Sequence, residues 1–111
     1  MKSSEIITPE GNISQYTIDN DNELNFIFSH ANGFNGRVYN SLLYKIKNNY
    51  NIHTYDMRGH GDTTLKANPN NLKSWYSFRD DLLSVIENFK TPVVLSGHSM
   101  GATASLLVAL H

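Results

Sequence analysis

Short apolar stretches bounded by glycines and polar residues recur along the chain and predict strands. Residues 13–18 alternate between apolar and polar side chains, which is typical of an outer strand. The later stretches are more continuously apolar, as expected for strands covered on both faces. These later strands are predicted at residues 24–29, 51–56 and 93–96.

Between these stretches, apolar residues recur every third or fourth position, which predicts helices. One helix is expected over residues 37–48 and another over 100–110. The remaining helix is expected to start at Ser74 as its N-cap and to end before Pro92. Its apolar positions are Trp75, Phe78, Leu82, Val85 or Ile86, and Phe89.

The order of these elements alternates between strands and helices. Such alternation predicts an α/β fold with a mostly parallel sheet and helices on both faces. Ligands of such folds bind at the carboxyl ends of the strands. Glycine-containing loops follow three of the predicted strands, and we therefore expect them to converge on one side of the molecule. Their sequences are HANGF (30–34), DMRGHGD (56–62) and GHSMG (97–101).

The stretch GHSMG lies where a predicted strand turns directly into a predicted helix. A turn this sharp is expected to strain the backbone of Ser99, with a positive φ, and to expose its hydroxyl. Gly97 and Gly101 fit because a side chain at either position would collide with the closely approaching backbone. The N–H of Met100, at the start of the helix, is a candidate donor to an oxyanion.

The stretch HANGF, with its glycine Gly33, is expected to turn a second backbone N–H toward the same point. Either Phe34 or Asn32 is a candidate for this donor, and the sequence leaves both open. His30 is expected to hold the loop by hydrogen bonds. In DMRGHGD, an ion pair between Asp56 and Arg58 is expected to hold the loop without a catalytic role.

The composition narrows the classes of function. The chain has 111 residues, which suits a single domain, and its net charge of −1 indicates no nucleic-acid partner. It has no cysteine, so disulfides and thiolate chemistry are excluded. No apolar run is long enough for a signal peptide or a membrane span, and we therefore expect a soluble, cytoplasmic protein. The oligomeric state is left open.

Taken in this order, HANGF, DMRGHGD and GHSMG resemble the oxyanion loop, the loop after the fourth strand and the nucleophile elbow of the α/β-hydrolase family. The resemblance runs from about residue 13 to the end of the chain and implies the serine hydrolase branch. It implies that Ser99 attacks an ester, thioester or similar carbonyl of a small molecule and forms an acyl-enzyme. His98, Gly97 and Gly101 would support the elbow, and no metal or organic cofactor is expected.

The family's catalytic acid and base follow the nucleophile in the chain, in the order Ser, Asp or Glu, His. We expect His98 to diverge from Ser99, and His111 to lie too far away, at roughly 18 Å along a helix. His30 and His60 remain as alternatives for the base.

We therefore expect residues 1–111 to be the N-terminal part of a single hydrolase domain that is marginally stable and inactive alone. Strand 93–96 would then be an open edge. The alternative is a non-catalytic module of the same fold that binds a ligand or a partner. A nucleotide-binding domain is disfavoured because the phosphate-binding motifs are absent.

Overall fold

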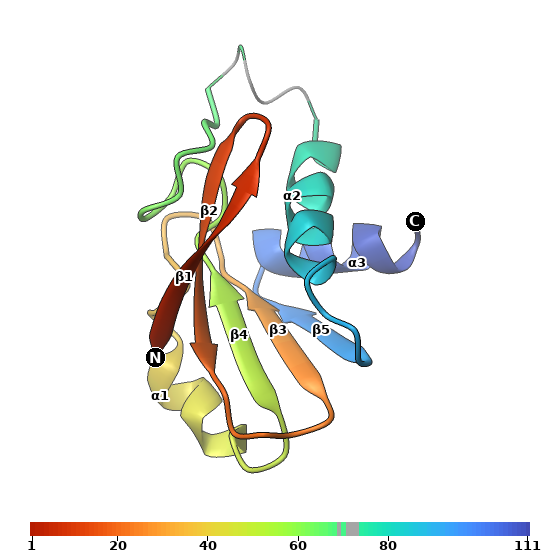
Figure 1. Cartoon of the computed structure of the whole chain (residues 1–111). Helices are drawn as coiled ribbons and strands as arrows, with labels where there is room; N and C mark the ends of the chain where they lie inside the picture. Colours follow the sequence, from red (N-terminus) through yellow and green to blue (C-terminus); the bar gives the residue numbers. More distant parts are fainter. Residues whose placement is uncertain (69, 71–73) are drawn as a thin grey trace.

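A five-stranded sheet with the strand order β1-β2-β4-β3-β5 forms the centre of the molecule (Figure 1). The computed structural model describes residues 1–68, 70 and 74–111. The strands are β1 (Lys2–Thr8), β2 (Gly11–Ile18), β3 (Asn25–Ser29), β4 (Asn51–Tyr55) and β5 (Val93–Gly97). The helices are α1 (Asn40–Leu43), the 3-10 turn η1 (Tyr44–Ile46), α2 (Tyr76–Ile86) and α3 (Met100–Ala109).

The α/β class predicted from the sequence is confirmed, and the parallel pairing is confined to one half of the sheet. β3 pairs in parallel with both β4 and β5. β2 pairs antiparallel with β4 and with β1. The sheet is therefore mixed, and the three parallel strands are those whose carboxyl ends carry the three glycine-containing loops.

Helices cover both faces of the sheet, as predicted, because neighbouring residues of a strand point to opposite faces. On β3, Ile27 belongs to the larger core cluster, which includes Leu82 of α2 and Ala104 of α3. The next residue, Phe28, packs instead with Leu43 of α1. Figure 1 shows α2 and α3 together on one side of the sheet and α1 on the other.

β1, which forms a hairpin with β2, was not predicted from the sequence. Most side chains of β1 are exposed, so its residues show no clear alternation of apolar and polar positions. The sequence of the turn does indicate a hairpin, because Pro9 and Gly11 occupy positions typical of a tight turn. In the structure, Thr8 pairs with Gly11 across this turn. A proline and a glycine between two β-prone stretches were thus the available evidence for this hairpin.

The helix expected over residues 37–48 is shorter and less regular than predicted. The α-helix covers only Asn40–Leu43 and continues as a 3-10 turn over Tyr44–Ile46. No side chain caps its N-terminus, and asparagine, serine and tyrosine have low helix propensity, so packing of Leu43 and Ile46 provides the support.

The helix expected from Ser74 begins at Tyr76, and Trp75 occupies its N-cap position. Ser74 still accepts a hydrogen bond at its Oγ from the N–H of Tyr76, at 3.2 Å. The side chain therefore supports the first turn, one residue earlier than the capping position.

β5 lies at one edge of the sheet, as predicted, with β3 as its neighbour. The C=O of Pro92 accepts from the N–H of Asn25, and the N–H of His98 donates to Ser29. Since backbone groups of successive residues point to alternate sides of a strand, those of Val93, Leu95 and Gly97 point away from β3. No other strand in the described part of the chain pairs with this edge.

We expect Val94→Lys to weaken self-association of the chain about tenfold, because a lysine on an open edge disfavours strand pairing with a second molecule. Val94 is 37% exposed, so little packing is lost. Sedimentation at several protein concentrations measures the effect. Leu106→Lys, at a 60% exposed position of α3, is the matched control. Equal effects of the two substitutions would show that association does not proceed through the strand edge.

His53 of β4 is buried as a neutral side chain. Its ring packs against Phe89 with centroids 4.4 Å apart. The Nε2–H donates to Asn25 Oδ1 at 2.9 Å, and Nδ1 accepts from the hydroxyl of Thr17 at 3.1 Å. Burial lowers the pKa of His53 from 6.5 to about 4.

We expect the free energy of unfolding to fall as the pH is lowered from 6.5 to 4. In this interval the unfolded chain binds a proton at His53 and the folded chain does not, which gives a slope of at most about 1.4 kcal/mol per pH unit. Urea unfolding across this range measures the slope. His53→Gln should reduce the slope without abolishing it, because burial also lowers the pKa of His30, whereas His111→Gln, at an exposed position, should leave the slope unchanged. An unchanged slope in His53→Gln would contradict the assignment.

Candidate active site

The three glycine-containing loops meet at the carboxyl ends of β3, β4 and β5, as predicted. Hydrogen bonds join them directly. The N–H of Met57 donates to His30 Nε2 at 2.9 Å, and the N–H of Gly33 donates to His60 Nε2 at 2.9 Å. The N–H of His98 donates to the C=O of Ser29, at 3.0 Å, so the elbow is bound to the end of β3.

Ser99 has the strained backbone that the sequence predicts, with φ 55° and ψ −113°. Among the described residues, Asp21 is the only other non-glycine residue with a positive φ. Such a conformation costs about 1–3 kcal/mol and persists only where the surrounding structure imposes it. The Ser99 side chain is exposed, and its hydroxyl forms no hydrogen bond within the described residues.

The glycines on both sides of Ser99 are required by close backbone contacts, as predicted. A Cβ on Gly97 would lie less than 3.0 Å from the backbone of Gly101 and Ala102. A Cβ on Gly101 would lie equally close to the backbone carbonyls of Ser29 and His30. The backbone at the start of α3 therefore packs in close contact with the backbone at the carboxyl ends of both β5 and β3.

Two backbone N–H groups next to this junction are free. Within the described residues, neither the N–H of Met100 nor that of Asn32 has an acceptor. Of the two alternatives for the second oxyanion donor, Phe34 is disfavoured, because its N–H donates to the C=O of Ala31 at 3.1 Å. The N–H groups of Asn32 and Met100 therefore have no acceptor within the described residues, whereas that of Phe34 has one.

His30 holds its own loop by a hydrogen bond, as predicted, and also binds the loop after β4, which the sequence did not predict. It is fully buried, its Nδ1–H donates to the C=O of Ala31 at 2.8 Å, and its Nε2 accepts from Met57. Burial lowers the pKa of His30, so the neutral form that this pair of bonds requires is favoured. With both ring nitrogens engaged, His30 has no free lone pair to take a proton from Ser99.

His60 is engaged in the same way. Its Nδ1–H donates to the C=O of Arg58 at 3.0 Å, and its Nε2 accepts the N–H of Gly33. The Asn32 side chain lies 3.1 Å from this same Nε2. His60 therefore holds the loop that carries Asn32, and it is not placed to act as a base.

The side chain of His98 points away from Ser99, as predicted. Its Nδ1 lies 2.8 Å from the hydroxyl of Tyr39, which also accepts the N–H of Ala31 at 3.3 Å. Phe34 lies beside it, with ring centroids 6.3 Å apart. His98 thus connects the elbow to the HANGF loop through Tyr39, a contact that no sequence pattern predicted.

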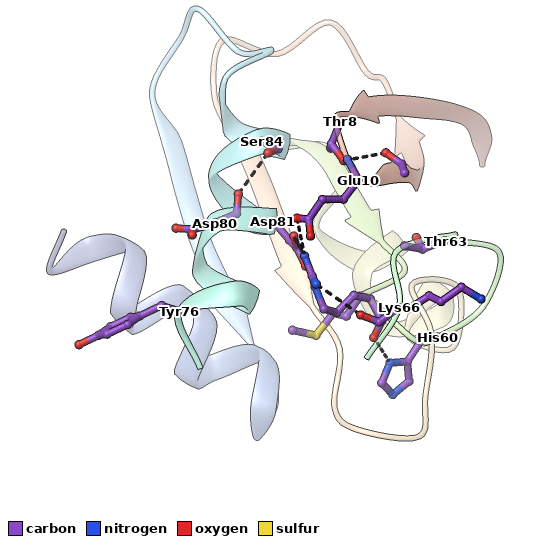
Figure 2. Close-up of polar contacts among 12 residues, drawn as sticks. Thr8, Glu10, His60, Thr63, Lys66, Tyr76, Asp80, Asp81 and Ser84 are labelled. Atoms are coloured by element: carbon purple, nitrogen blue, oxygen red, sulfur yellow. Dashed lines mark hydrogen bonds and ion pairs between the residues drawn. The ribbon is translucent and has the colours of Figure 1, made fainter. Parts of the chain in front are cut away.

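The predicted ion pair between Asp56 and Arg58 is wrong. Arg58 binds Asp81 of α2 instead, with Nε 2.7 Å from Oδ2 and a second nitrogen 2.8 Å from Oδ1. Figure 2 shows Asp81 and Glu10 converging on this point from α2 and the β1–β2 turn. The planar guanidinium can donate two parallel hydrogen bonds to one carboxylate. Because Arg58 and Asp81 are 23 positions apart in the chain, no local sequence pattern predicts this pair.

Asp56 is buried and accepts from neutral donors. Its carboxylate accepts the hydroxyl of Tyr16 at 2.6 Å and the N–H groups of Gly36 and Asp62 at 2.8 and 2.9 Å. These donors compensate for the loss of hydration of a buried carboxylate. Asp56 thereby ties the loop after β3 to the loop after β4.

The charges of Arg58 and Asp81 are mutually dependent. Burial raises the pKa of Asp81, and the hydrogen bonds from Arg58 oppose this shift. The hydrogen bond to Asp81 raises the pKa of Arg58. Both side chains are almost completely buried, whereas Glu10, at 3.5 Å from Arg58, is 65% exposed.

Arg58→Met should therefore lower the free energy of unfolding by about 3–5 kcal/mol, because it leaves the carboxylate of Asp81 buried without its partner. Glu10→Gln, which removes the exposed partner of the same guanidinium, should cost less than about 1 kcal/mol. Urea unfolding at neutral pH measures both variants. If the two substitutions lowered the free energy of unfolding by similar amounts, Asp81 would not be the main partner of Arg58.

The chain matches the model of the alpha/beta hydrolase family over residues 26–111. It therefore belongs to this family. No curated protein matches the sequence. Within the described residues, no group of three or more His, Cys, Asp or Glu residues is arranged to hold a metal ion, and no helix is long and apolar enough to cross a membrane.

Several solved structures share the fold. The thioesterase domain from the curacin biosynthetic pathway superposes with a TM-score of 0.86 at 20% identity, over 98% of this chain and 39% of that one. An N-acyl homoserine lactonase, AidH, gives 0.84 at 19% identity, over 99% and 40%. A hydrolase from Pseudomonas aeruginosa gives 0.84 at 19% identity, over 98% and 41%. This chain thus spans about 40% of the length of the structures it matches.

Proposed function

We propose that the protein is a serine hydrolase in which Ser99 attacks the carbonyl carbon of an ester, thioester or related substrate. The observation that carries this proposal is the strained backbone of Ser99 between β5 and α3, which leaves its hydroxyl exposed beside the free N–H of Met100. In the attack the Ser99 Oγ bonds to the carbonyl carbon and gives its proton to a base. The leaving alcohol or thiol departs with a proton, and water then releases the acyl group.

The backbone N–H groups of Met100 and Asn32 are proposed to stabilise the oxyanion formed in this attack. They are held in place before the substrate binds, and no part of the chain has to reorganise around the new charge. One such donor contributes about 10²–10³-fold to the rate in other acyl-transfer enzymes. The names of two structural relatives, a thioesterase and a lactonase, support a substrate with an acyl carbonyl.

We further propose that residues 1–111 are the N-terminal part of a single hydrolase domain and that its catalytic acid and base come from residues that follow this part. Two observations support this. Both ring nitrogens of His30 and of His60 are engaged in loop contacts. The chain also covers only about 40% of the matching structures.

A second candidate is a module with this fold that binds a ligand without cleaving it. One specific observation favours it, because no histidine among the described residues forms a hydrogen bond with Ser99. The two candidates differ in whether the Ser99 hydroxyl becomes nucleophilic when the fold is complete.

A fluorophosphonate probe should label Ser99 in a protein that carries residues 1–111 together with the remaining strands of the domain. Labelling should disappear in Ser99→Ala and persist in Ser105→Ala, where the buried hydroxyl donates to the C=O of Ser96. The isolated chain should label at least about a hundredfold more slowly, since it lacks a base. Mass spectrometry of the labelled peptide identifies the site. A folded, complete domain without labelling would support the binding module instead.

A further inference from the structure

The sequence contains two Asn-Gly pairs, and both lie in the loop after β3, at residues 32–33 and 35–36. In such a pair the backbone nitrogen of the glycine can attack the side-chain carbonyl carbon of the asparagine, because glycine has no Cβ to obstruct the approach. Ring closure expels ammonia and leaves a cyclic imide. The surroundings of the glycine nitrogen therefore decide which of the two pairs reacts.

The first pair, Asn32-Gly33, is exposed, and a Cβ on Gly33 would have no described atom within 4 Å. The pair occupies the centre of a turn that is closed by the hydrogen bond from the N–H of Phe34 to the C=O of Ala31. This turn does not use the N–H of Gly33, which donates instead to His60 Nε2 at 2.9 Å. Ring closure at Gly33 is therefore unobstructed, and the proton that its nitrogen must lose already points at an imidazole lone pair.

His60 contacts both of the nitrogens that change places in this reaction. Its Nδ1–H donates to the C=O of Arg58, which leaves Nε2 as an acceptor. The Oδ1 of Asn32 lies 3.1 Å from this Nε2. Two acceptors cannot share a hydrogen bond, so a half turn of the amide, which exchanges Oδ1 and Nδ2, gives the favourable contact. One ring nitrogen can thus take the proton of Gly33 and pass it to Nδ2, the leaving group.

The second pair, Asn35-Gly36, has the same two residue types in surroundings that oppose the reaction. The N–H of Gly36 donates to the buried carboxylate of Asp56 at 2.8 Å, and Asn35 Oδ1 accepts the N–H of Arg37 at 3.0 Å. A Cβ on Gly36 would lie 2.9 Å from Thr54 Oγ1, so the packing leaves little room for ring closure. A carboxylate is also a weaker base than an imidazole. Asn35 is therefore a control site within the same loop.

We propose that Asn32 is a site of intramolecular deamidation, in which His60 Nε2 acts as the base toward the backbone nitrogen of Gly33. The Gly33 nitrogen forms a bond to Asn32 Cγ and gives its proton to His60. The bond between Cγ and Nδ2 breaks, and Nδ2 leaves as ammonia with that proton. Water then opens the imide at either of its carbonyls, which gives aspartate or isoaspartate. His60, which is not placed to take a proton from Ser99, thus has a base function within its own loop.

The reaction would change the proposed oxyanion site. In the imide the nitrogen of Gly33 carries no hydrogen, so its bond to His60 is lost. After hydrolysis, a carboxylate stands where the neutral amide of Asn32 was, and its charge opposes the negative charge that develops in the transition state. This consequence rests on the proposed function. The deamidation itself does not involve Ser99, so its failure and the failure of the hydrolase activity are separate outcomes.

Mass spectrometry of the folded 111-residue chain during incubation at neutral pH measures the reaction. Chymotrypsin, which cleaves after aromatic residues, separates the two sites because it cuts at Phe28, Phe34 and Tyr39. Asn32 should deamidate at least about tenfold faster than Asn35. In urea above the unfolding transition, where the contacts of both sites are lost, the two rates should approach each other. Similar rates at the two sites in the folded chain, or a difference that persists in urea, would overturn the proposal.

The products identify the nucleophile. Isoaspartate arises when water opens the imide at the backbone carbonyl, so its appearance at position 32 shows that the Gly33 nitrogen closed the ring. Fragmentation by electron transfer distinguishes isoaspartate from aspartate in the peptide. Aspartate alone at this position would indicate direct hydrolysis by water and would overturn the role of Gly33.

His60→Gln tests the base. A glutamine amide can accept the N–H of Gly33 and donate to the C=O of Arg58, as the imidazole does, but it cannot take up the proton. The variant should slow deamidation of Asn32 at least about tenfold and leave the rate at the control site unchanged. His111→Gln, at an exposed position, should change neither rate. A folded His60→Gln chain that deamidates as fast as the unsubstituted chain, or faster, would overturn the base function. If this variant unfolds, the comparison of the two sites in the unsubstituted chain still decides the proposal.

Discussion

The close approach of α3 to the carboxyl ends of β3 and β5 is the constraint on which the candidate site depends. Gly101 lies directly against the backbone carbonyls of Ser29 and His30, and Gly97 lies against the first turn of α3. The chain can reverse from strand to helix in so short a distance only if Ser99 adopts its positive φ. The exposed hydroxyl and the free N–H of Met100 are consequences of this packing.

Buried polar contacts then fix the neighbouring loops relative to that junction. His30 and Asp56 join the loops after β3 and β4, and Arg58 anchors the second of these loops to α2. These three side chains each have specific partners, and an alternative position of either loop would leave their charges or donors unsatisfied. The position of Asn32 is therefore set by groups that take no part in the proposed reaction.

The mixed sheet explains why the two halves of the molecule differ. The antiparallel hairpin of β1 and β2 continues the sheet on one side and carries Glu10 toward Arg58. On the other side, β5 has no further strand paired with its edge among the described residues, and Leu106 of α3 and Leu110 just after it are exposed. An unpaired strand edge and exposed apolar side chains are both surfaces that favour association with other chains.

The sequence by itself determined the features that depend on neighbouring residues. Strands β3, β4 and β5, the positive φ of Ser99 and the need for Gly97 and Gly101 follow from short apolar runs and from local sterics. The role of His30 was also predicted, because a histidine inside a buried loop has few alternatives to hydrogen bonding with the backbone.

Only the tertiary structure decided which distant groups meet. Arg58 pairs with Asp81 on another element. The N–H of Phe34 donates to a turn carbonyl, while that of Asn32 has no acceptor in the described part of the chain. The hairpin of β1 gains its stability from pairing with β2, and its own pattern of side chains does not reveal it. Residues from the loops after β3 and β4 and from the starts of α2 and α3 line one cleft. Which distant groups contact one another depends on burial and geometry across the whole fold, so no local pattern of residues predicts these contacts.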